Sequence, residues 1–194
     1  MDAAFKQAAQ QRPPIVFGLR LCPLSVGHLK LLLEQDSPLA GATKDPPDFF
    51  DFLLAVFICS NPHNQSRRNI RAWWAPLFFS IWGRLSRRYK FTEELQKFHR
   101  YLDAGKSMPR INWKLRGREL QSPPVYRLLV MLMRDFHFSE EAALDMPVAK
   151  ANLLWSTKGD LEGTLELISE RVSDLWEFAH QEDLKKLKSE EAKN

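Results

Sequence analysis

Apolar residues recur three and four positions apart along most of this chain, the spacing that places them on one face of an α-helix. Ser25 and Ser139 stand where a serine can cap a helix, and Asp45-Pro46 is a further helix-start signal. The pattern predicts helices over residues 25–36, 45–60, 92–104, 124–135, 139–145 and 147–158. We therefore expect an all-α fold, a mainly helical single domain.

The segment Ile15–Leu21 departs from this period, because its residues alternate between apolar and small or polar types. Ile15, Phe17, Leu19 and Leu21 would share one face, opposite Gly18 and Arg20. Such alternation is typical of a half-buried strand. The sequence therefore predicts one short N-terminal strand.

The clearest helical period defines a tryptophan stripe: Ile70, Trp73, Trp74, Leu77, Phe78, Ile81, Trp82 and Leu85. Pro76 lies inside it and predicts a kink or a break. A wide apolar stripe can face the protein's own core or a partner. Both interpretations stay open, with Trp73, Trp74 and Trp82 as the candidate partner-binding residues.

A second stripe, the C-terminal seam, belongs to a long helix predicted to begin near Thr164. Its residues recur at alternating spacings of four and three, the rhythm of a coiled-coil seam: Leu161, Leu165, Ile168, Val172, Leu175 and Ala179. This seam can equally pack into the core or grip a partner helix. Leu165, Ile168, Val172, Leu175 and the adjacent Trp176 are its candidate partner-binding residues.

The length of 194 residues suits one domain with its own core. We divide the chain into an N-terminal arm (1–14), a helical domain (15–180) and a charged C-terminal tail (181–194). Residues 106–123 show no helical stripe and predict a flexible loop.

Charge is distributed unevenly along the chain. Residues 65–134 carry 16 basic and 4 acidic side chains, a net charge of +12, whereas residues 135–194 carry a net charge of −7. The two parts can neutralise each other, or the basic part can bind an acidic partner. Because this basic segment is also rich in aromatic residues, nucleic-acid binding through 65–134 is the alternative function. Most of its tryptophans lie on the stripe, and no nucleic-acid-binding signature is present, which makes this alternative the weaker one.

Residues that could carry catalysis or bind metal are scattered. The five histidines form no HExxH pattern, and the two cysteines, Cys22 and Cys59, form no CxxC pair. Glycine-rich phosphate loops and the GxSxG elbow are also missing. We expect a protein that is not an enzyme and has no cofactor and no metal, with both cysteines reduced.

Targeting signals are not apparent either. The longest apolar run, Phe49–Cys59, is interrupted by Asp51 and is too short to cross a bilayer. The first 14 residues contain no apolar segment of the secretory type. We expect a cytoplasmic protein without a membrane partner.

Four stretches of the chain stand out when they are read in order: FGLRLCPLSVGHLKLLLEQDSPLA, DFLLAVFICS, GRELQSPPVYRLLVMLMRDFHFSEEAALDMPVAKANLLW and GDLEGTLELIS. Together they resemble the tail assembly chaperones of tailed bacteriophages, and FSEEAALDMP is the most telling segment. The resemblance spans residues 15–170. The basic loop Lys106–Arg118 belongs to no pattern of that family.

The resemblance implies a function in virion assembly. Proteins of this type are encoded beside the tape measure protein and bind it, keeping this long helix-rich chain soluble while the tail tube polymerises. It implies the tape measure protein as partner, with the tail tube protein and a second copy of the chain as further candidates. The location would be the cytoplasm of the infected or lysogenic host cell. Either apolar stripe could cover the partner's seams.

Overall fold

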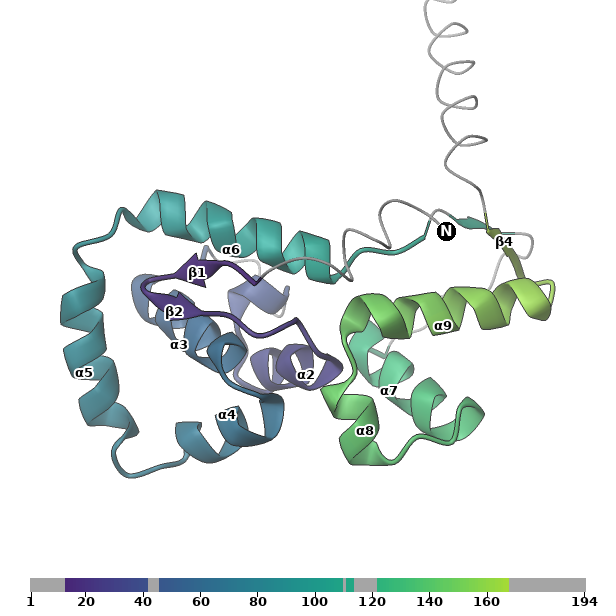
Figure 1. Cartoon of the computed structure of the whole chain (residues 1–194), viewed down its shortest axis with the longest axis horizontal. Coiled ribbons are helices and arrows are strands. Elements are labelled where there is room, and N and C mark those ends of the chain that lie inside the picture. The colour runs from purple at the N-terminus through teal and green to yellow at the C-terminus, as the bar shows by residue number, and fades with distance from the viewer. Residues whose placement is uncertain (1–12, 42–45, 110, 114–121, 168–194) are drawn as a thin grey trace, which may run out of the picture.

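A computed structural model describes residues 13–41, 46–109, 111–113 and 122–167 of the chain (Figure 1). It is mainly helical, which confirms the predicted fold class. The helices are α2 (Val26–Glu34), η1 (Pro38–Ala40), α3 (Phe49–Ser60), α4 (His63–Ile70), α5 (Ala75–Ser86), α6 (Phe91–Gly105), α7 (Pro124–Asp135), α8 (Glu140–Asp145) and α9 (Val148–Leu161). Two antiparallel sheets pair β1 (Ile15–Val16) with β2 (Leu19–Arg20), and β3 (Ile111–Trp113) with β4 (Leu165–Leu167).

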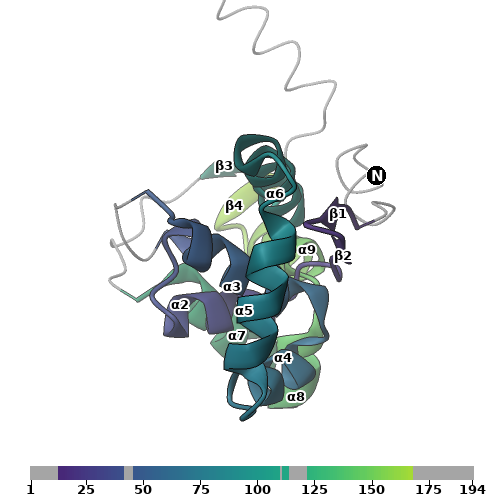
Figure 2. The ribbon, with the colours of Figure 1, turned by 90° about the vertical axis from the view of Figure 1, so that its left-hand side faces the viewer.

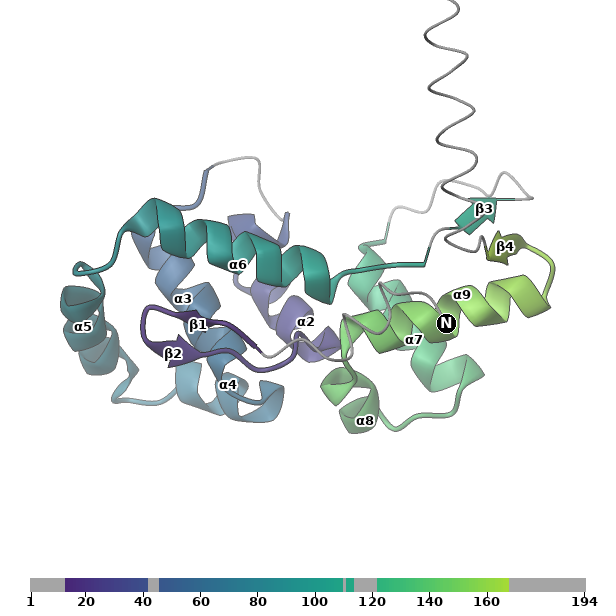
Figure 3. The same cartoon turned by 45° about the horizontal axis from the view of Figure 1, so that its top comes forward.

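The helices form an elongated molecule with α5 at one end and α7, α8 and α9 at the other (Figure 1). Helices α2 and α3 lie between these ends, and α6 runs along one side of them, which the tilted view confirms (Figure 3). Figure 2 looks at the molecule from the α5 end. Helix α5 therefore has one side against the molecule and the other toward solvent.

Helix starts follow local capping chemistry. The Ser25 hydroxyl accepts from the His28 backbone N–H, and Ser139 caps α8 through the Ala142 N–H, both as predicted. Helix α3 begins later than predicted, because Asp48 rather than Asp45 is its N-cap and exchanges hydrogen bonds with Asp51.

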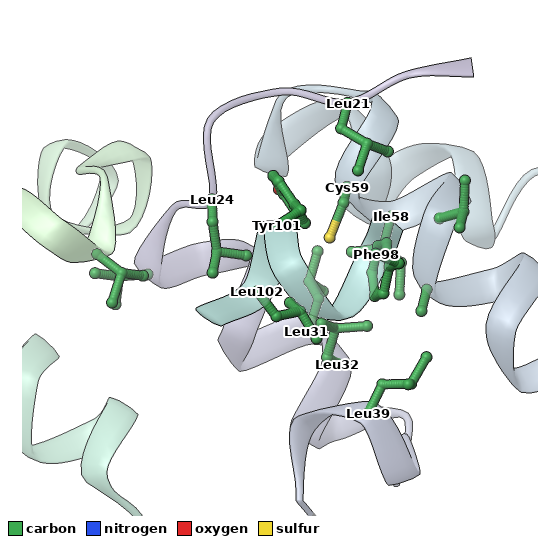
Figure 4. Packing of buried hydrophobic residues seen from close by; sticks show 14 of the residues in the cluster. Leu21, Leu24, Leu31, Leu32, Leu39, Ile58, Cys59, Phe98, Tyr101 and Leu102 are labelled. Atoms are coloured by element: carbon green, nitrogen blue, oxygen red, sulfur yellow. The ribbon is translucent and has the colours of Figure 1, made fainter. Parts of the chain in front are cut away.

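The core is organised around α3, which is apolar on nearly all sides and buries Phe52, Leu53, Val56 and Ile58 among others. Leu31 and Leu32 of α2, together with Phe98 and Leu102 of α6, pack around the Cys59 end of this helix (Figure 4). The burial of α3 therefore fixes the positions of its neighbours.

The segment expected to form a short N-terminal strand is extended, but it consists of two strands, because β1 and β2 form a hairpin only two residue pairs long. Phe17 and Gly18 both have positive φ, 47° and 78°, as tight two-residue hairpin turns require. The reversal also changes which side chains face inward. Val16 is fully buried, whereas Ile15 is 56% exposed.

The hairpin turn is inserted between α3, α5 and α6. The Phe17 ring contacts the rings of Phe49, Phe52, Trp82 and Tyr89. Its N–H donates to the Glu94 carboxylate at 2.8 Å, and its carbonyl accepts from Trp82 Nε1 at 3.3 Å. We call Phe17, Trp82 and Glu94 the Phe17 clamp; it ties the N-terminal segment to α5 and α6.

The C-terminal part also differs from the prediction. The helix expected from Thr164 is a strand over Leu165–Leu167, paired with β3 inside the segment expected to be a structureless loop. Gly163 has a φ of 70°, and the Thr164 N–H bonds the Gly159 carbonyl, so the chain turns back on α9 before the strand. Residues 1–12, 114–121 and 168–194, which hold most of the predicted arm, part of the predicted loop and all of the tail, lie outside the described residues.

His28 is a buried titratable group at the start of α2. Its Nδ1 accepts from the Ser25 N–H at 3.2 Å, and its Nε2 lies 2.8 Å from the Asn61 carbonyl, so the neutral ring protonated on Nε2 satisfies both neighbours. A second proton would sit on Nδ1, where it would place the ring N–H against the Ser25 N–H. Burial lowers the pKa of His28, and nearby His63 adds to this effect.

Replacing Glu94 with alanine should destabilise the protein by about 2 kcal/mol, because the buried Phe17 N–H loses its charged acceptor. Urea unfolding measures the loss. The matched control is Glu93→Ala on the exposed side of α6, whose pairing with the exposed Lys90 should contribute much less to stability. Equal losses in the two variants would contradict the clamp.

Acid should destabilise the protein through His28. The unfolded chain binds a proton near the ordinary histidine pKa, whereas the folded chain binds it only at lower pH. The stability contributed by neutral His28 is therefore complete above about pH 6.5 and is lost as pH falls below that value. Urea unfolding at pH 7.5 and 5.5 should show a smaller difference in His28→Gln than in the wild type. An unchanged difference would assign the acid sensitivity to other groups.

Candidate partner-binding face

Helix α5 presents a row of large apolar side chains to solvent. Leu77, Ile81 and Leu85 recur every fourth residue and lie on one side of the helix, in line with Trp73 in the preceding turn. Their exposed fractions are 63%, 54%, 49% and, for Trp73, 90%. We call these four residues the apolar row. Contiguous exposed apolar residues are unusual on a monomer and mark interaction sites.

The opposite side of α5 holds the helix in place. Trp82 is buried against the Phe17 ring and donates its indole N–H to the Phe17 carbonyl. Phe78 and Phe79 pack against Phe57 of α3, with ring centroids 5.2 and 5.0 Å away. Trp82, Phe78 and Phe79 therefore pack into the core, and this packing leaves the apolar row facing outward.

The tryptophan stripe is thus divided rather than continuous. Trp82 is buried, Trp74 is half-buried, and only Trp73 is freely exposed. Pro76 lies in the first turn of α5, where it starts a helix instead of kinking one, and a turn separates this helix from α4. Trp82, expected as a partner-binding residue, serves the core. Leu77 and Ile81, which were not expected to bind, lie on the free side.

The C-terminal seam is described only at its beginning. Leu165 lies in β4 and is 1% exposed, because its side chain packs on Gly159 of α9. This residue belongs to the protein's own packing. Ile168, Val172, Leu175 and Trp176 lie outside the described residues.

Positive charge surrounds the apolar row. Between Asp51 and Glu93 the sequence contains seven basic residues and no acidic one. Arg84 and Arg88 follow Ile81 and Leu85 by three positions, so they flank the row along one side of the helix. A partner helix that packs on the row is therefore favoured when it carries acidic residues beside its own apolar stripe.

Few aromatic side chains of the basic segment are free for base stacking. Trp82 and Tyr101 are buried, and Tyr101 donates its hydroxyl to the Cys22 carbonyl at 2.9 Å. Among the described side chains of this segment, Trp73, Tyr89 and Tyr126 are exposed. These three rings make a smaller stacking platform than the sequence suggested.

Chemistry in the described part of the chain is sparse. No three His, Cys, Asp or Glu residues there lie close enough to hold a metal ion. Cys22 and Cys59 are free, and burial raises the pKa of the Cys59 thiol to about 12, which keeps it protonated and unreactive. None of the described helices combines the length and the apolar character needed to cross a bilayer.

Comparison of the chain with models of protein families, with curated proteins and with solved structures finds no match in any of the three. The apolar row and the charges beside it are therefore the features of this chain that bear on its function.

Neighbouring residues on the two sides of α5 should respond differently to truncation. Trp82→Ala should cost about 3–5 kcal/mol because it empties a buried site and removes the indole donor to Phe17. Ile81→Ala should cost less than about 1 kcal/mol because the side chain is half in water already. Thermal or urea unfolding of both variants checks the contrast. A large loss for Ile81→Ala would mean that the row serves internal packing.

Proposed function

We propose that this protein is a tail assembly chaperone of a tailed bacteriophage that binds the tape measure protein through the apolar row of α5. The observation that carries the proposal is the row itself: four large apolar side chains left in water at one end of the molecule. The four sequence stretches that resemble this family, taken in their order along the chain, support the tape measure protein as the partner.

The physical fit is that of helix against helix. From Leu77 to Leu85 the row spans nine residues, a rise of about 12 Å along the helix. A partner helix can place apolar residues spaced three and four apart along it. Each large side chain buried on binding contributes about 1.5–3 kcal/mol before the cost of association. A row of this size suits a reversible contact, which an assembly chaperone needs because it must release its client.

Removing the row should separate binding from folding. The variant Leu77→Asp/Ile81→Asp places two carboxylates where the partner's apolar residues would pack, while both positions face solvent in the free protein. Co-expression with the tape measure protein encoded beside the gene should yield a complex with the wild type. With the variant we expect at least about a tenfold loss of co-purified partner.

The matched control uses a second exposed apolar pair. Val130 and Met133 lie on α7, at the other end of the molecule, so Val130→Asp/Met133→Asp makes the same change of charge away from α5. This control should co-purify normally, and all proteins should melt within a few degrees of the wild type. Loss of binding only in the control would move the site to α7.

The alternative function, nucleic-acid binding, predicts a different dependence of affinity on salt. Binding through Arg67, Arg68 and Arg71 would weaken steeply and linearly in a plot of log affinity against log salt. We expect only weak binding to mixed-sequence DNA, lost at physiological salt. Submicromolar affinity under that condition, abolished by Arg67→Glu/Arg68→Glu, would replace the chaperone proposal.

A further inference from the structure

A groove of about 270 Å³ lies between α3 and α5, and Arg84, which flanks the apolar row, is one of its lining residues. Its lining includes three phenylalanines, Phe49, Phe50 and Phe79, together with Pro76, Ser80, Gly83 and the two arginines Arg84 and Arg87. Gly83 faces α3, where the Leu53 side chain lies 3.4 Å from the position that a Cβ on Gly83 would take. The groove is large enough for one bulky apolar side chain.

The two arginines at the rim of the groove favour a negatively charged ligand. Arg84 and Arg87 are both exposed, and within the described ranges no carboxylate forms an ion pair with either. Phe50, 65% exposed, adds an apolar surface beside them. The chemistry that fits is an aromatic residue with a carboxylate on each side, because the ring fills the groove and the carboxylates reach the guanidinium forks.

This chain contains such a segment. Asp174-Leu175-Trp176-Glu177-Phe178 places two aromatic residues among acidic ones, in a part of the sequence outside the described residues. We infer that the α3–α5 groove binds the segment 174–178 of a second copy of the chain. This contact is one between copies and does not depend on the tape measure protein.

The reach of the chain favours a second copy over the same molecule. Trp176 is nine residues beyond Leu167, which span about 13 Å as a helix and about 30 Å when fully extended. The groove lies at the Phe91 end of α6, where Phe91 meets Phe49, and β4 lies beside α9 past the other end. Helix α6 alone is 15 residues, about 22 Å long. Trp176 could reach the groove of its own molecule only if the residues between Leu167 and Trp176 were almost fully extended.

Mutual binding of the segment 174–178 by two copies would limit the assembly to a dimer. If each copy places its segment 174–178 in the groove of the other, two equivalent contacts form about a two-fold axis and no groove is left open. The expected product is a dimer rather than a filament. The four residues of the apolar row are not among those that line the groove, so the dimer does not occupy them.

A charge swap between two full-length variants tests this inference. Arg84→Glu/Arg87→Glu reverses the rim, and Asp174→Arg/Glu177→Arg reverses the segment. Sedimentation velocity of each variant alone should show dimerisation at least about tenfold weaker than that of the wild type, because like charges meet. An equimolar mixture should recover it, because each groove then faces a segment of opposite charge. Arg67→Glu/Arg68→Glu on α4 makes the same charge change elsewhere and should dimerise normally.

Three results would overturn the inference. A wild type that stays monomeric up to about 100 μM lacks the contact. Dimers that persist in both variants place the interface elsewhere. Variants that are monomeric alone and stay monomeric when mixed show that the groove and the segment do not bind each other. Circular dichroism melting of each variant shows that it is folded, which is expected because both arginines are exposed. None of these readouts involves the tape measure protein, so they stand apart from the test of the proposed function.

Discussion

The insertion of Phe17 between three helices is the contact on which the arrangement of α5 depends. A hairpin turn carries polar backbone groups, and burying them is costly unless each finds a partner. Here the Glu94 carboxylate, only 4% exposed, accepts the Phe17 N–H, and the Trp82 indole donates to the Phe17 carbonyl. The turn is therefore both an apolar plug and a hydrogen-bonded bridge from α6 to α5.

This bridge determines which side of α5 is left for binding. With Trp82 directed at Phe17, and Phe78 and Phe79 at Phe57, the helix cannot rotate without losing several aromatic contacts. Leu77, Ile81 and Leu85 are consequently directed to solvent. A stable core contact at one end of the chain thus maintains an exposed apolar surface that would otherwise collapse inward, and this constraint connects the fold to the proposed function.

Local chemistry made most of the helices predictable. Ser25 and Ser139 cap helices because a serine hydroxyl needs only a backbone N–H two or three residues on. The errors arise where distant segments decide the outcome. Leu165 has helical spacing from its neighbours, yet pairing with β3, more than fifty residues earlier, places it in a strand. Phe17 alternates like a strand residue and lies in a turn, since its position is fixed by Glu94 on another helix.

The candidate site was predicted only in part, for the same reason. The spacing of the tryptophan stripe identified α5 as amphipathic, but a single period cannot tell which edge of a wide stripe faces the core. The signal that separates the edges is the pair Arg84 and Arg88, which continue the side of Leu77 and Ile81 rather than that of Trp82. Charged residues at helical spacing from an apolar row indicate the edge that meets water.

Methyl NMR shows directly whether the apolar row meets the proposed partner. An apolar-striped helix from a tape measure protein, the proposed partner, would be titrated into protein with labelled Ile, Leu, Val and Met methyl groups. The account predicts that the methyl signals of Leu77, Ile81 and Leu85 shift, whereas those of the buried Ile58 and Leu132 do not. Shifts confined to Val130 and Met133 of α7, or no shifts at all, would contradict it.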